Sequence, residues 1–143
     1  MGLSLLMVSL GILLLGIGIR RLKKPVSAWF FAKTPYTVVG AWGGIPLGLA
    51  ALLWGIAFSP FVTQASARLL LPIGLVIGLI GPFIMYIFFK PAWLKWLTQE
   101  HRAILPILEN EALEMGYNAL DRRLKSRQDL EGWIAEVRRK YGR

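Results

Sequence analysis

The chain has 143 residues, of which 55% are hydrophobic, and a formal net charge of +9; its long apolar runs exceed what a soluble core of this size could bury, so lipid is the expected solvent. It contains no cysteine, which excludes disulfides, thiolate zinc sites and cysteine-ligated iron–sulfur clusters. The positive charge lies in short connectors and in a tail of mixed sign, which argues against a nucleic-acid footprint and favours a protein or anionic membrane surface.

The first apolar run extends from Leu3 to Ile19, carries no charge and is followed directly by the basic sequence RRLKK. A secretory signal would place its positive charges before the apolar run and a small-residue cleavage site after it. Because the order here is reversed, we predict an uncleaved membrane anchor.

Two further apolar runs cover about residues 36–58 and 69–89. Each exceeds the roughly 20 residues that a helix needs to cross the hydrocarbon core. Pro46 and Pro82 lie inside these runs, and in a membrane the neighbouring helices can satisfy the carbonyl groups that a proline frees. Together with residues 3–19, the runs predict three transmembrane helices, with kinks at the two prolines.

Basic residues in the short connectors predict the orientation of these helices. The connector after the first run contains five lysines and arginines, the connector after the second contains one, and the segment after the third begins with Lys90, Lys95 and Arg102. This pattern predicts an outer amino terminus and a cytoplasmic tail, and we expect a bacterial plasma membrane. The residues assigned to the inner membrane interface are Arg20, Arg21, Lys23, Lys24, Trp93 and Trp96.

Glycines recur every four residues at Gly40, Gly44 and Gly48 in the second run, and at Gly74 and Gly78 in the third. Small residues at this spacing let two helices approach closely in lipid. We therefore predict that the second and third helices pack through these faces across their short outer loop, whereas the glycines of the first run do not share the spacing. The alternative is that a lipid, carotenoid or quinone tail lies along the stripe; no other cofactor is expected.

Residues 90–143 are predicted to form a cytoplasmic helical tail that follows a transmembrane domain of residues 1–89. The tail opens with KPAWLKWLTQEHRAIL, in which tryptophan and leucine alternate with lysine, and this pattern predicts a helix lying in the headgroup region. The alternative is that the tryptophans fill a small cytoplasmic core. Pro106 is expected to open the next helix and Gly116 to cap it.

Ser126 can cap the last helix, after which apolar side chains recur at helical spacing. About fifty residues in short helices make a thin core of their own. The apolar stripe therefore belongs either to a small cap under the membrane domain or to a surface that docks on a partner, and we assign it the docking role. Its residues are Leu130, Trp133, Ile134, Val137 and Tyr141.

No acidic, basic or histidine side chain lies within the three apolar runs. Ion paths and proton relays in membranes are normally marked by such residues, so a transporter or pump working alone is not expected. His101 is the only histidine, and because a functional site needs converging partners, we interpret it as a surface or core residue. The carboxylates Glu109, Glu111 and Glu114 fit a solvated helix start, so we predict no catalytic or metal site.

The sequence therefore predicts an all-α membrane protein that is a non-catalytic accessory or structural subunit of a larger integral-membrane complex, for example a respiratory, photosynthetic or transport complex. Its expected partners are other integral-membrane subunits and lipids, not nucleic acid. One alternative is a self-associating pore- or lesion-forming protein, because three spans, an outer amino terminus and a charged inner tail resemble the plan of small phage holins. Another is a small membrane enzyme that uses His101.

Overall fold

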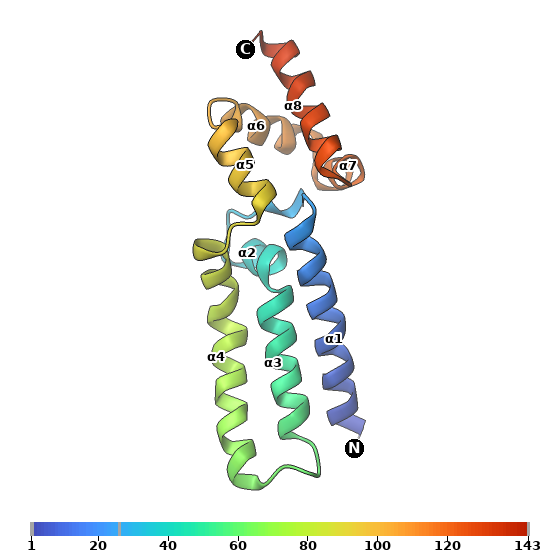
Figure 1. Ribbon diagram of the computed structural model, residues 1–143, viewed down its shortest axis with the longest axis vertical. Coiled ribbons are helices and arrows are strands. Elements are labelled where there is room, and N and C mark those ends of the chain that lie inside the picture. Colours follow the sequence, from blue (N-terminus) through green and yellow to red (C-terminus); the bar gives the residue numbers. More distant parts are fainter. Residues whose placement is uncertain (1, 26, 143) are drawn as a thin grey trace.

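The computed structural model describes residues 2–25 and 27–142, and every regular element within them is a helix, which confirms the all-α class. Three helices run along the long axis of the molecule, and most of the others gather at one end (Figure 1). In chain order the elements are α1 (Gly2–Lys23), η1 (Ser27–Trp29), α2 (Pro35–Trp42), α3 (Gly44–Ala57), α4 (Gln64–Phe88), α5 (Ala92–Glu100), α6 (Leu105–Met115), α7 (Tyr117–Arg123) and α8 (Arg127–Tyr141).

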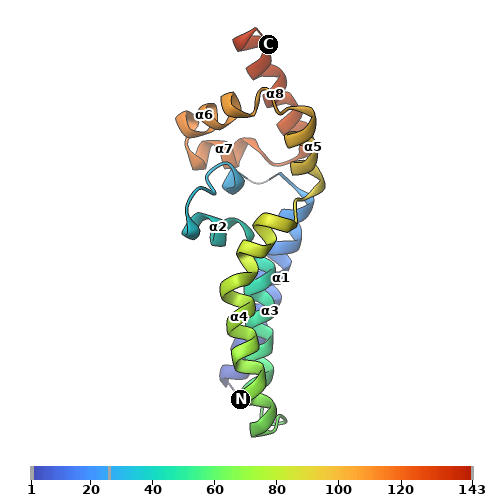
Figure 2. The ribbon, with the colours of Figure 1, turned by 90° about the vertical axis from the view of Figure 1, so that its left-hand side faces the viewer.

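Helices α1, α3 and α4 form a flat layer that is one helix thick, hereafter the membrane layer. α3 lies between α1 and α4 in Figure 1, and the three overlap after a turn of 90° in Figure 2. α1 and α4 are each long and apolar enough to cross a membrane, and α2 together with α3 would add a third, bent span. Among the described residues there are therefore two or three helices that could cross a membrane.

The second predicted span is broken rather than kinked at its proline. α2 and α3 meet at Gly43 with a bend of 76°. The break comes before Pro46 because the proline ring clashes with the carbonyl group four residues earlier, that of Trp42. Pro46 itself lies in the first turn of α3, where its missing N–H would have no helical partner in any case. α4, by contrast, continues through Pro72 and Pro82 as one helix.

The glycine face of α3 packs on α1, and not on α4 as predicted. A Cβ atom added to Gly44 would lie 2.7 Å from the Cα of Gly18, and one added to Gly48 would lie 2.8 Å from the backbone nitrogen of Leu15. The two backbones therefore touch. α1 permits this approach because Gly11 and Gly18 are two helical turns apart, so that they lie on the same face and are both buried.

The glycines of α4 meet α3 through different residues. Gly74 lies against the indole of Trp54, and Gly78 lies against Ala50. The Trp54 indole N–H also donates a hydrogen bond of 3.1 Å to a backbone carbonyl of α4. The predicted packing between the second and third runs is thus present, but side chains of α3 fill the space that the α4 glycines leave. Gly40 takes no part, because it lies in α2, where an added Cβ would meet nothing within 4 Å.

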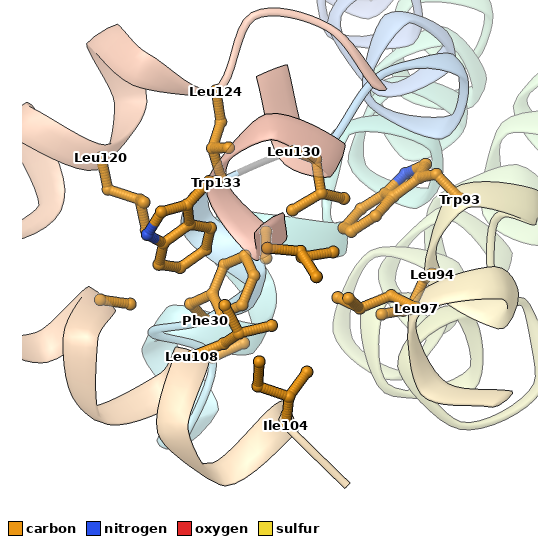
Figure 3. Packing of buried hydrophobic residues seen from close by; sticks show 14 of the residues in the cluster. Phe30, Trp93, Leu94, Leu97, Ile104, Leu108, Leu120, Leu124, Leu130 and Trp133 are labelled. Atoms are coloured by element: carbon orange, nitrogen blue, oxygen red, sulfur yellow. The ribbon is translucent and has the colours of Figure 1, made fainter. Parts of the chain in front are cut away.

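Helices α5 to α8 and the α1–α2 connector form a second unit, hereafter the cap, whose apolar core extends onto buried side chains of α2 (Figure 3). At its centre, Trp133 of α8 is 1% exposed, and its ring meets the ring of Phe30 edge to face with 5.4 Å between centroids. Phe30 comes from the α1–α2 connector, so the core is not built from the tail alone. This contribution explains how four short helices can bury a common core.

The apolar stripe of α8 is consequently internal, and its predicted docking on a partner is corrected by the fold. Leu130, Ile134 and Val137 are buried in the cap together with Trp133. Tyr141 ends the stripe at the surface; it is 45% exposed, and its hydroxyl donates a hydrogen bond of 2.6 Å to a carboxylate of α6.

α5 is also part of the cap rather than a helix lying in the headgroup region. Trp93 is 3% exposed, Leu97 is fully buried, and Trp96 is half-buried. The alternative that the tryptophans fill a small core of the tail is therefore the one the fold adopts. The reason is that α6, α8 and the connector supply apolar side chains that cover this face of α5, as the common cluster shows.

The predicted helix boundaries in the tail are confirmed. Pro106 stands in the first turn of α6, and Gly116, with a φ of 82°, ends that helix. A positive φ is costly for residues with a Cβ atom, which explains a glycine there. Ser126 caps α8, since its hydroxyl accepts a hydrogen bond of 3.2 Å from the backbone N–H of Asp129.

Candidate functional site

The basic end of α1 and helix α7 line a cavity of about 620 Å³ where the membrane layer meets the cap, hereafter the junction cavity. The lining brings together two segments that are far apart in the sequence. It contains four cationic side chains, one carboxylate and apolar residues from both helices. The lining residues are Ile17, Arg20, Arg21, Lys24, Pro25, Tyr117, Asp121, Leu124 and Lys125.

The walls of the junction cavity are tied together by a hydrogen bond. The hydroxyl of Ser27, which is buried, donates to a carboxylate oxygen of Asp121 at 2.7 Å. A buried hydroxyl without a partner would be costly, so this bond favours the observed approach of α7 to the α1–α2 connector. It also engages the only carboxylate of the lining.

Arg21 has a structural task beside this cavity. Its guanidinium donates hydrogen bonds to the carbonyl oxygens of Gly40 and Ala41, the latter at 3.4 Å. These carbonyls lie in the last turn of α2, where the helix dipole places partial negative charge. Arg21 therefore caps α2 at the bend. Lys23, the other basic residue predicted near it at the interface, is exposed and does not line the cavity.

The three remaining cations of the lining lie at the surface. Arg20, Lys24 and Lys125 are exposed and form no ion pair within the described part of the chain. Sequence reasoning placed the first two at the membrane interface but missed Lys125 and Tyr117. The only available signal was the basic character of the segment around Arg122 and Lys125, because nothing local shows that α7 reaches α1.

His101 lies in a separate cavity of about 350 Å³ on the cap. Its Nδ1 is 2.8 Å from a guanidinium nitrogen of Arg138, which can only donate, so Nδ1 accepts. Its ring is edge to face with Trp96, over which Arg127 is stacked at 4.6 Å. Burial, and then the positive charge of Arg138, lower the pKa of His101 below its ordinary value, while Glu100 and Glu131 oppose this shift.

Through these contacts, His101 connects the end of α5 to α8. A general base would need an accessible ring nitrogen and a reacting group within reach. Here Nδ1 already accepts a hydrogen bond from Arg138, so this nitrogen is not free to take a proton from a reacting group.

Two of the three carboxylates of α6, Glu109 and Glu111, pair with side chains of other segments. Glu109 lies 3.8 Å from the ammonium group of Lys33, and Glu111 accepts hydrogen bonds from Lys140 and Tyr141. The hydrogen bond from Lys140, followed by that from Tyr141, lowers the pKa of Glu111. Within residues 2–25 and 27–142, no group of three or more histidine, aspartate or glutamate side chains is arranged to hold a metal ion.

Taken together, the fold defines a helical protein with two or three membrane-compatible helices and a helical cap at one end. No protein-family model, curated protein or solved structure matches the chain.

Proposed function

We propose that this protein is a non-catalytic accessory or structural subunit of a larger integral-membrane complex, with its amino terminus outside and its cap in the cytoplasm. The observation that carries this proposal is the membrane layer itself. α3 is covered on two sides, whereas α1 and α4 keep most of their large aliphatic side chains exposed. In a membrane these faces are available to lipid and to the helices of other subunits.

The polar contacts inside the membrane layer support a scaffold rather than a transport path. The Ser4 hydroxyl donates a hydrogen bond of 2.6 Å to the carbonyl oxygen of Gly55, and the Trp54 indole donates to α4. Both donors are thus satisfied by backbone groups within the layer. Since the three apolar runs contain no acidic, basic or histidine side chain, the layer lacks the residues that normally mark ion paths and proton relays in membranes.

A groove on the membrane layer supports contact within the bilayer. It has a volume of about 610 Å³ and is lined by residues of the first half of α1, the carboxyl end of α3 and the first half of α4, namely Leu3, Met7, Trp54, Phe58, Leu71, Pro72 and Leu75. Side chains of this kind complement a neighbouring transmembrane helix. The cap, whose apolar stripe is internal, offers partners mainly a charged surface.

Crosslinking within the membrane tests this proposal. A photoreactive amino acid replaces Leu75 in the groove, and in a matched control it replaces Gln128, which is exposed on the cap. After irradiation of intact cells, purification in a mild detergent should yield a crosslink from position 75 to another integral-membrane protein. That protein should also co-purify with the unmodified chain.

Two results would count against this function. A chain that crosslinks only to lipid and purifies as a monomer would contradict a subunit role. Crosslinks between copies of the chain, together with collapse of the membrane potential on expression, would support the pore-forming alternative instead of the subunit role.

A further inference from the structure

We propose that the junction cavity binds a phosphate group, and specifically the headgroup of an anionic phospholipid in the inner leaflet. The first reason is charge. Arg20, Lys24 and Lys125 converge on one cavity without forming ion pairs among the described residues, and basic pockets at the cytoplasmic side of transmembrane helices recognise such headgroups.

The second reason is that hydrogen bonds fix the walls of the cavity. Arg21 is fixed on the carbonyls of α2, and Asp121 is fixed by the buried hydroxyl of Ser27. These bonds hold α1, the connector and α7 in place around the cations. The Asp121 carboxylate would repel a phosphate, but its hydrogen bond to Ser27 offsets part of its negative charge, and three available cations outweigh it. The phenol of Tyr117 adds a neutral hydrogen-bond donor to the lining.

The third reason separates a lipid from free phosphate. Ile17 lines the same cavity and lies one helical turn before Arg20 and Arg21. Below it, the exposed aliphatic side chains of Leu13 and Leu10 continue along α1. A phospholipid whose phosphate occupies the cavity could therefore lay an acyl chain on this surface, whereas inorganic phosphate would use only the cations.

The test measures lipid binding to the full chain in detergent by native mass spectrometry. The probes are phosphatidylglycerol, phosphatidylcholine and inorganic phosphate. The variant is Arg20→Gln/Lys24→Gln/Lys125→Gln, and the matched control is Lys90→Gln/Lys95→Gln/Arg102→Gln, which removes the same charge from exposed positions at the same end of the molecule but outside the cavity. Far-UV circular dichroism checks that each variant is folded, and Lys125→Gln alone is the milder substitute.

We expect the wild-type protein and the control to bind phosphatidylglycerol at least about tenfold more tightly than phosphatidylcholine, and the cavity variant to lose this preference. Saturable binding of inorganic phosphate that depends on the same residues, with equal affinity for both lipids, would confirm the phosphate site and overturn the lipid headgroup as its occupant. An equal loss in the control, or an unchanged preference in the folded cavity variant, would overturn the proposal. The assignment to the inner leaflet rests on the proposed function and its orientation. Lipid binding in detergent does not depend on orientation, so the headgroup site and the proposed function can be disproved independently.

Discussion

Glycine serves two different purposes in the membrane layer. On the α1–α3 side, Gly44 and Gly48 let two backbones touch, whereas on the α3–α4 side Gly74 leaves space for the Trp54 indole. Gly16 of α1 does neither, because an added Cβ would meet nothing within 4 Å. Glycine spacing in the sequence does not distinguish these cases. Because the surroundings differ, adding a methyl group should lower the stability of the fold at some of these glycines and not at others.

The first prediction compares Gly48→Ala with Gly16→Ala. At position 48 the new Cβ would lie 2.8 Å from a backbone nitrogen of α1, so the helices must separate, and we expect a loss of about 1–3 kcal/mol in the free energy of unfolding. At position 16 alanine should cost nothing, because it fits and favours the helix. Denaturation in mixed micelles, followed by tryptophan fluorescence, measures both. Equal effects would contradict the α1–α3 packing.

The second prediction concerns His101 and pH. Because its pKa lies below the ordinary value of 6.5 in the folded protein, the unfolded chain binds the proton more readily as the pH falls. Stability that is fully present above pH 6.5 should therefore be lost between that value and the lower folded pKa. Glu111 and Asp129, whose pKa values are lowered from 4.5 and 3.8, lose their contributions only at more acidic pH.

Thermal unfolding at pH 7.5 and 5.5 checks this window. The midpoint temperature of the wild-type protein should fall on acidification, and His101→Gln should remove most of that fall. Arg138→Gln should reduce it too, since it removes a positive charge that lowers the histidine pKa. An unchanged pH dependence in His101→Gln would show that other groups cause it.

At the level of helices, the bend between α2 and α3 has a local cause and is stabilised by a side chain from a distant part of the chain. Pro46 prevents a straight continuation of α2, and Gly43 occupies the break. The α2 carbonyls released at the bend then receive hydrogen bonds from Arg21 of α1. The α3 segment left beyond the bend has 14 residues and rises about 21 Å, less than the roughly 30 Å of a hydrocarbon core.

The third prediction is that Arg21→Gln loosens α2. The loss of a charged donor at a helix carboxyl end should cost about 1 kcal/mol. Hydrogen exchange should rise in residues 35–42 while the amides of α4 stay protected. Lys23→Gln is the matched control, because that neighbouring side chain is exposed and forms no ion pair among the described residues. Equal exchange in both variants would exclude the capping role.

The fourth prediction tests α8 as the central element of the cap. Trp133→Ala removes a nearly fully buried ring and should cost about 3–5 kcal/mol, whereas Leu113→Ala, at an exposed position of α6, should cost less than about 0.5 kcal/mol. Limited trypsin digestion should then cleave the cap of Trp133→Ala much faster than that of Leu113→Ala. Equal resistance would show that α8 is not needed for the cap core.

In the molecule as a whole, the two ends differ in their number of basic residues and in the helices that form them. The start of α1 and the α3–α4 loop lie at one end, and the cap with the basic end of α1 lies at the other (Figure 1). The cap end carries most of the basic residues, and such residues favour the cytoplasmic side.

The fifth prediction uses the absence of cysteine to test this orientation. Gln64→Cys, near the α3–α4 loop, should react with a membrane-impermeant maleimide in intact cells. Gln128→Cys, exposed on α8, should react only after the membrane is permeabilised. If position 128 reacted in intact cells and position 64 did not, the topology would be the reverse of the proposed one. Labelling of both positions in intact cells would contradict a membrane-spanning arrangement.

Properties that depend on a local stretch of chain could be predicted from the sequence. The helical class, the membrane-compatible length of α1 and α4, and the boundaries of α6 and α8 follow from apolar run length, proline, glycine and capping residues. The sequence predicts a kink at Pro46, whereas the helix breaks at Gly43 with a bend of 76°, because the sequence shows where a proline disturbs a helix but not how the chain redirects itself.

Which helix faces meet depends on the folding of the whole chain. The spacing of Gly44 and Gly48 shows that something approaches α3 closely, yet it does not show that α1 does so. Likewise, the stripe containing Trp133 must be covered, and the ring of Phe30, about a hundred positions away in the sequence, helps to cover it. An apolar or bare helix face requires a neighbour without specifying one, so the partner is chosen by the packing of the whole chain.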